Sequence, residues 1–160
     1  MPNIAVTDDL GSWMGLRPEM APGLIGLSEA VYSKSLLPRR VQEIARMRIA
    51  IANECEVCLG ARYASPAADG LDEAFYAQVL NWRSAPGYSE RERLAAEYAE
   101  RFALDHVGLR ADAEFWQRHR QQFSDAEIVD LAICCSLWLG AGRTMRVLDV
   151  GQSCSLTLGT

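Results

Sequence analysis

The chain has 160 residues, of which 49% are hydrophobic and 23% charged, and its formal net charge at pH 7 is −5. This length is sufficient for one domain with a hydrophobic core, and the composition is that of an ordinary globular protein. The net negative charge disfavours non-specific binding to nucleic acid. We therefore expect a single domain spanning residues 1–160 that has no nucleic-acid partner.

The sequence shows no sign of secretion or membrane insertion. Residues 1–11 include Asp8 and Asp9 and lack the basic and apolar regions of a secretory signal. The longest uncharged stretch, residues 131–142, is too short to span a bilayer and favours a buried helix or a subunit interface. The five cysteines are an odd number, which does not fit a secreted disulfide scaffold. We expect a cytoplasmic protein with no membrane partner.

Helical periodicity dominates the chain after an irregular N-terminal segment, residues 1–22, which is rich in glycine and proline. Two capping boxes, Ser89 with Glu92 and Ser124 with Glu127, mark helix starts. Gly140 and Gly142 are expected to interrupt the last long helix. The helical segments cover residues 24–36, 37–54, 55–64, 71–82, 89–106, 111–122, 124–139 and 143–150. Apart from residues 155–158, no segment has strand periodicity, so we predict an all-α domain of about seven helices.

The most informative motif is the pair Cys55 and Cys58, a Cys-x-x-Cys unit typical of reversible thiol–disulfide chemistry. If Asn53 or Glu54 caps a helix, Cys55 lies in its first turn, where the helix dipole lowers the pKa of a thiol. Cys58 then lies one turn deeper on the same face. This arrangement predicts an exposed thiol and a more buried one, which together can form a sulfenic acid and resolve it to a disulfide.

Two structural interpretations of the pair remain open. Both cysteines could be core residues, since free cysteine is often buried. They could also be half of a zinc site, but a second half with suitable spacing is absent, because Cys134 and Cys135 are adjacent and His106 and His119 are far apart. A thioredoxin-like module would need βαβ elements, which this sequence lacks.

A thiol pair needs a proton acceptor, and Glu43 is a candidate. On one straight helix Glu43 would lie about 18 Å from Cys55. A reversal of the chain near Asn53 would instead fold two helices together and let Glu43 face the thiols; otherwise it is an ordinary surface acid. Arg46 and Arg48 on the same segment are interleaved with apolar residues, which favours a solvated or salt-bridged helix face.

The spacing of Glu43, Asn53, Cys55 and Cys58 resembles the carboxymuconolactone decarboxylase-like superfamily, specifically its alkylhydroperoxidase AhpD-like branch. The resemblance extends over residues 36–148. It implies an all-helical fold, a homo-oligomer such as a trimer or hexamer, and no haem, flavin or metal cofactor. It also implies that the cysteine pair reduces small-molecule hydroperoxides, that the glutamate belongs to a proton relay, and that an external dithiol restores the thiols.

The sequence departs from the family pattern at Arg62, where the family has a histidine four residues after the second cysteine. Arginine does not exchange protons at neutral pH, but one turn below Cys58 it could pair with Glu43 and stabilise a thiolate. We expect Cys55, Cys58, Glu43 and Arg62 to form the catalytic site of a thiol-dependent, peroxidase-like oxidoreductase. The alternatives are a cofactor-free lyase resembling the decarboxylase branch and a non-catalytic, redox-sensing helical oligomer.

Overall fold

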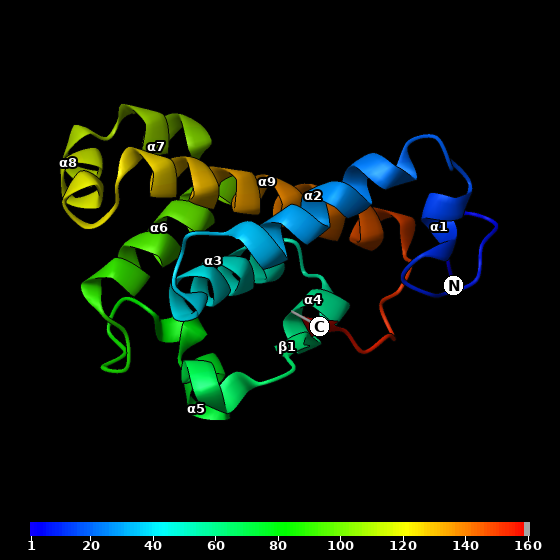
Figure 1. Cartoon of the computed structure of the whole chain (residues 1–160), viewed down its shortest axis with the longest axis horizontal. Coiled ribbons are helices and arrows are strands. Elements are labelled where there is room, and N and C mark those ends of the chain that lie inside the picture. Colours follow the sequence, from blue (N-terminus) through cyan, green and yellow to red (C-terminus); the bar gives the residue numbers. More distant parts are fainter. Residues whose placement is uncertain (159–160) are drawn as a thin grey trace.

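The computed structural model describes residues 1–158 and is built almost entirely of helices (Figure 1). The α-helices are α1 (Ser12–Gly15), α2 (Ala21–Lys34), α3 (Arg39–Ala52), α4 (Glu56–Gly60), α5 (Glu73–Ala77), α6 (Glu90–Leu104), α7 (His106–Ala111), α8 (Ala113–Gln122) and α9 (Asp125–Leu148). Two 3₁₀ turns, η1 (Pro66–Asp69) and η2 (Val79–Asn81), and two strands, β1 (Arg62–Tyr63) and β2 (Thr157–Leu158), complete the described residues. The predicted all-α class is confirmed, although nine α-helices are present in this part of the chain rather than about seven.

Helix α3 lies at the centre of the molecule, between α6 and α9, and α2 runs along α9 (Figure 1). The sequence of α3 is apolar on more than one side, so its residues Ile44, Ala45 and Ile49 are fully enclosed. Helices α7 and α8 gather at one end of α6 and α9 (Figure 1). This arrangement places the C-terminal end of α3, and the thiols that follow it, against the middle of α9.

Both predicted capping boxes are formed, at Ser89 with Glu92 and at Ser124 with Glu127. In each, the serine side chain accepts from the backbone of the glutamate and the glutamate accepts from the backbone of the serine. The helix that starts at Ser89 ends earlier than predicted, at Leu104, because the carboxylate of Asp105 accepts from the amide of Gly108 and starts α7.

The glycines of α9 do not interrupt it, so the predicted break near Gly140 is wrong. Gly142 is instead a point of close approach inside a continuous helix. A Cβ atom on Gly142 would lie 2.8 Å from Asn53 Nδ2 and 3.4 Å from Cys58 Sγ. The missing side chain therefore lets α9 pack directly against the segment that carries the thiols.

Because α9 is continuous, its 24 residues would by length and composition suffice to cross a membrane, and its most apolar 18-residue window has a mean hydropathy of 1.3. Residues 131–142 alone would be too short. A single helix of this kind is weak evidence for insertion, since core helices meet the same criteria. Only 33% of its apolar window is buried, so α9 has one face in the core and one open apolar face.

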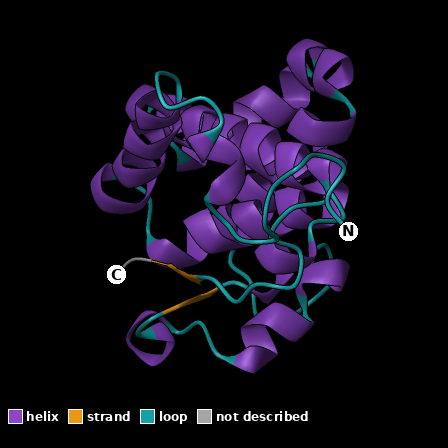
Figure 2. Ribbon diagram, turned by 90° about the vertical axis from the view of Figure 1, so that its right-hand side faces the viewer, coloured by secondary structure: helices purple, strands orange, loops and turns teal. Residues whose placement is uncertain are grey.

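The predicted helix over residues 55–64 is shorter than expected. It ends at Gly60, and the chain continues as β1, which pairs in parallel with β2 (Figure 2). The register joins Arg62 to Thr157 and Tyr63 to Leu158. The C-terminal segment is thereby fastened beside the thiol-bearing helix α4.

Candidate active site

The thiols are brought back towards α3 by a sharp reversal of the chain. Glu54 has a φ of 50°, a left-handed conformation that ends the path of α3. Asn53 fixes this turn to α9: its Nδ2 donates to the carbonyl oxygens of Trp138 at 3.1 Å and Leu139 at 3.2 Å. The prediction that Asn53 or Glu54 caps the thiol helix is wrong, because Cys55 itself is the N-cap residue of α4.

Cys55 and Cys58 are joined by a disulfide, with a Cα–Cα distance of 5.2 Å. The predicted division into an exposed and a more buried thiol is present, and the more exposed thiol is that of Cys58. Cys55 is 0% exposed, because it precedes the helix and faces the core. Cys58 is partly exposed and is therefore the thiol that a small molecule can reach.

Glu43 is 0% exposed, and the cation that accompanies it is Arg46, which is 3% exposed. Arg46 donates from Nε to Oε2 and from Nη2 to Oε1 of Glu43, both at 2.7 Å. Its Nη1 also donates to the carbonyl oxygen of Cys58 at 2.5 Å. Burial alone would lower the pKa of Arg46, but the Glu43 carboxylate outweighs it and raises that pKa. The result is a buried, charged pair directly beneath α4.

The predicted pair between Glu43 and Arg62 is not formed. Because α4 ends at Gly60, Arg62 lies in β1 rather than one helical turn below Cys58. Its Nε donates to Glu73 Oε1 at 3.2 Å, and its guanidinium lies 3.8 Å from the centre of the Tyr76 ring. Burial and then the negative charge of Glu43 raise the pKa of Tyr76, whose buried hydroxyl has no hydrogen bond of normal geometry among the described residues.

The sequence predicts that Arg46 lies on a salt-bridged or solvated helix face. It does not identify Arg46 as the partner of Glu43 next to the thiols. The available signal was its spacing of three residues from Glu43 on an otherwise apolar helix, since residues i and i+3 are neighbours. A carboxylate buried on such a helix requires a partner. Arg39 and Arg40 have equivalent spacings from Glu43 on the other side, so the sequence alone does not select Arg46.

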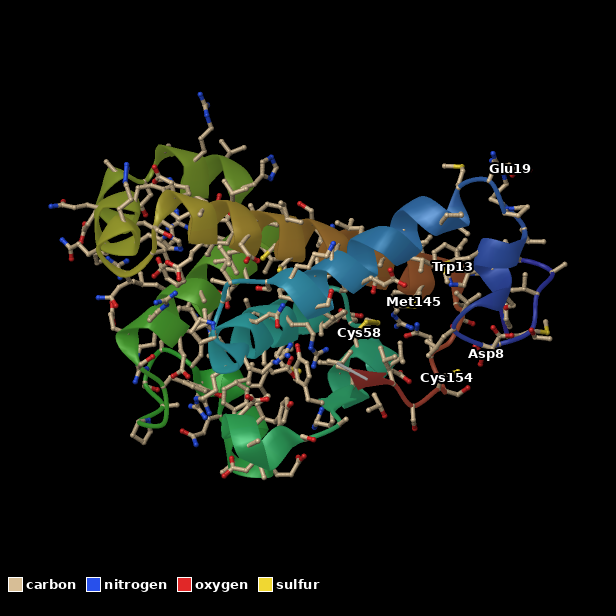
Figure 3. All side chains as sticks on the ribbon, viewed as in Figure 1. Asp8, Trp13, Glu19, Cys58, Met145 and Cys154 are labelled. Atoms are coloured by element: carbon tan, nitrogen blue, oxygen red, sulfur yellow. A yellow bond between two sulfur atoms is a disulfide. The ribbon has the colours of Figure 1, made fainter. Side chains whose placement is uncertain are left out.

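Cys58 borders an internal cavity of about 130 Å³. The cavity is lined by Ser28, Tyr32, Arg46, Ala50, Cys58, Leu137, Trp138, Ala141, Gly142, Met145 and Leu156. It adjoins a wider groove of about 730 Å³, whose further lining includes Leu10, Trp13 and Leu24. In Figure 3, Cys58, Met145 and Trp13 follow one another outward from the thiol helix towards the N-terminal segment. The cavity and the groove share lining residues such as Leu137 and Met145, and the groove also includes the charged residues Glu29 and Arg39.

The site therefore combines an accessible thiol, a second thiol that can close a disulfide with it, and a fixed buried cation. Among residues 1–158, no group of three or more histidine, cysteine, aspartate or glutamate side chains is arranged to hold a metal ion. The predicted residues Cys55, Cys58 and Glu43 are brought together by the turn at Glu54, whereas Arg62 faces a different set of partners.

The solved structures that share this fold include the following three. One is a protein of unknown function from Agrobacterium tumefaciens, provisionally named as the antioxidant defence protein AhpD, with a TM-score of 0.74, 22% identity, and coverage of 93% of this chain and 96% of that chain. The second is a cysteine-to-alanine variant of the debrominase Bmp8 in complex with 2,3,4-tribromopyrrole, with a TM-score of 0.71, 16% identity, and coverage of 88% and 74%. The third is an uncharacterised peroxidase-related protein from Silicibacter sp. TM1040, with a TM-score of 0.67, 18% identity, and coverage of 84% and 70%.

At these identities the three structures establish the fold alone. A comparison with curated protein sequences found no match. The model of the carboxymuconolactone decarboxylase family matches residues 18–101, which is more than half of the chain and contains Glu43, Arg46 and both cysteines of the disulfide. The predicted resemblance is confirmed, and the chain belongs to the carboxymuconolactone decarboxylase family.

Proposed function

We propose that the protein is a thiol-dependent peroxidase of the alkylhydroperoxidase type, in which Cys55 and Cys58 cycle between dithiol and disulfide. The observation that carries the proposal is the position of Cys58. It borders an apolar cavity together with Arg46, and it is within disulfide reach of a buried second thiol. A permanently charged guanidinium at the cavity wall favours the thiolate form, which is the reactive nucleophile.

The proposed cycle starts with Cys58, since it is the thiol open to the cavity. Its thiolate attacks the terminal oxygen of the hydroperoxide, the O–O bond breaks, and Cys58 becomes a sulfenic acid while the alcohol leaves. The Cys55 thiol then attacks the Cys58 sulfur, its proton leaves with the hydroxyl group as water, and the disulfide forms. An external dithiol reduces this disulfide and is itself oxidised.

Glu43 and Arg46 act as a fixed unit in this proposal. The bidentate contact keeps the guanidinium beside the carbonyl of Cys58 and orients it towards the cavity. Arg46 thus takes the place that the sequence assigned to Arg62. Arg62 instead anchors β1 through Glu73 and the Tyr76 ring.

Single-turnover oxidation tests the proposal. Reduced protein is mixed with one equivalent of tert-butyl hydroperoxide, and free thiols are then mapped by alkylation and mass spectrometry. We expect loss of two thiols and formation of the Cys55–Cys58 disulfide. In a Cys55→Ser variant, a sulfenic acid that dimedone traps should accumulate on Cys58. Cys154→Ser is the matched control, because Cys154 is a partly exposed free cysteine outside the pair.

The alternatives predict different results. A redox sensor would form the disulfide but would not turn over when a dithiol reductant and excess hydroperoxide are supplied together. A cofactor-free lyase would need neither cysteine, so its activity would survive the Cys58→Ser substitution. Unchanged thiols in the wild-type pair after treatment with hydroperoxide would exclude the peroxidase.

A further inference from the structure

Cleavage of a hydroperoxide leaves an alkoxide or hydroxide ion that must take up a proton. The family position for a histidine holds Arg62, which is turned towards Glu73. Arg46, the cation of the cavity wall, cannot donate a proton at neutral pH. The proton must therefore come from another group at the cavity or from water.

The residues that line the cavity limit which group can donate this proton. Its side chains with an exchangeable proton other than the cysteine and the arginine are Ser28, Tyr32 and Trp138. An indole N–H is far too weak an acid, and a serine hydroxyl is comparable in acidity to the alcohol being formed. A phenol, with an ordinary pKa near 10, is a far stronger acid than water or an aliphatic alcohol.

The hydroxyl of Tyr32 accepts a hydrogen bond and still has its own hydrogen to donate. Trp138 Nε1 donates to Tyr32 Oη at 3.2 Å, which uses a lone pair of the phenol and leaves the phenol's own hydrogen uncommitted. Within the part of the chain that the structure describes, that hydrogen has no acceptor. Tyr32 lines the same cavity as Cys58.

The surroundings also suit a phenol that must lose its proton briefly. Burial raises the pKa of Tyr32, which keeps the hydroxyl protonated at neutral pH before the reaction. The charge of Arg46 and the Trp138 hydrogen bond act in the opposite direction and favour the tyrosinate, while the charge of Glu43 adds to the effect of burial on this pKa. The ring is held in place by an edge contact with Tyr63, at 6.4 Å between centroids.

We propose that Tyr32 is the proton donor to the leaving oxygen when Cys58 is oxidised, a role that rests on the peroxidase function proposed above. The Cys58 thiolate forms an S–O bond to the terminal peroxide oxygen and supplies its electron pair. The O–O bond breaks, and the departing alkoxide takes the hydrogen of Tyr32 Oη and leaves as the alcohol. The tyrosinate then regains a proton from water, which enters through the wider groove.

Leaving-group dependence tests this role. The Tyr32→Phe variant is compared with the wild type in single-turnover oxidation by tert-butyl hydroperoxide, whose alkoxide needs a proton. A peroxy acid, whose carboxylate leaving group needs none, and iodoacetamide serve as acid-independent reagents. Removal of the general acid should slow oxidation by tert-butyl hydroperoxide about 100-fold. The rates with the peroxy acid and with iodoacetamide should be essentially unchanged. Tyr88→Phe is the matched control, because Tyr88 is a buried tyrosine that donates to the Phe75 carbonyl, away from the cavity.

The outcomes separate the two proposals. Equal slowing with all three reagents would show that Tyr32 only shapes the cavity and would overturn the acid role. An unchanged rate with tert-butyl hydroperoxide would overturn it as well. If the wild-type thiols react with iodoacetamide but with no hydroperoxide, the peroxidase function fails first and the role of Tyr32 fails with it.

Discussion

His119, in α8, offers a quantitative test of how tightly the side chains around this helix are packed. Its imidazole is 0% exposed and is surrounded by the rings of Tyr98, Phe115, Trp116 and Phe123. Neither ring nitrogen has a hydrogen-bond partner among the described residues. Burial, with a smaller contribution from the charge of Arg120, lowers the pKa of His119 from its ordinary 6.5 to about 4. The folded protein therefore requires a neutral imidazole.

The sign of the effect follows from proton linkage. Between pH 6.5 and pH 4 the unfolded chain binds a proton at His119 that the folded chain does not, so the free energy of unfolding falls as the pH is lowered. With the lowered pKa of about 4, the loss is about 2 kcal/mol at pH 5 and about 3 kcal/mol at pH 4. For a chain of 160 residues, the value at pH 5 corresponds to a drop in Tm of roughly 4–8 °C.

The perturbation is His119→Leu, which replaces the imidazole with an apolar side chain of similar size. We expect the variant to be at least as stable as the wild type at pH 7, because two unpaired buried nitrogens are removed. Its advantage should grow by about 2 kcal/mol between pH 7 and pH 5. Thermal and urea unfolding followed by circular dichroism at several pH values measures this difference. His106→Gln, at an exposed histidine, is the control.

Parallel stability curves for the wild type and His119→Leu would refute the reasoning. They would mean that His119 is charged in the folded state or reaches water, and that the aromatic enclosure is not closed. A wild type that loses stability only below pH 4, where carboxylates titrate, would lead to the same conclusion.

Three further predictions concern the site and the open face of α9. Arg46→Met should destabilise the fold by about 3–5 kcal/mol by leaving Glu43 charged and buried, and adding Glu43→Gln should recover part of that loss in urea unfolding. Gly142→Ala should lower the free energy of unfolding by about 1–3 kcal/mol and alter the alkylation rate of the reduced thiols, because the added Cβ would displace Asn53. A variant that behaves like the wild type would mean that α9 and Asn53 are not in close contact. The wild-type chain should sediment as a homo-oligomer, and the substitution Ile133→Glu on the exposed side of α9 should dissociate it. A wild-type monomer of 17.7 kDa at micromolar concentration would exclude this assembly.

The features of the fold that local chemistry determines were predictable from the sequence. The capping boxes at Ser89 and Ser124 depend on residues three positions apart, and both are formed. The errors arose where a distant contact decides the outcome. Gly142 reads as a helix breaker by propensity, but its packing against Asn53 keeps it inside α9. Propensity is a weak prior at such positions, because tertiary contacts outweigh differences of about 1 kcal/mol.

The candidate site followed the same pattern. The disulfide between Cys55 and Cys58 could be expected from their spacing, since one turn of chain suffices to close it. Which thiol faces the cavity could not, because that depends on the left-handed turn at Glu54 and on the face of α4 that meets α9. A residue with a φ of 50° that is not glycine leaves no clear trace in the sequence.

In the structure Arg46, and not Arg62, is the cation next to Cys58. This changes which residues can perform each step of the proposed reaction. A histidine can both stabilise a thiolate and pass a proton, so one residue could serve both needs. Arg46, locked to Glu43 and buried, supplies a fixed charge and no proton. In the peroxidase that we propose, activation of the nucleophile and protonation of the leaving group would then fall to different residues. The hydroxyl of Tyr32, which accepts from Trp138 and lines the same cavity as Cys58, is the group that we propose for the second role.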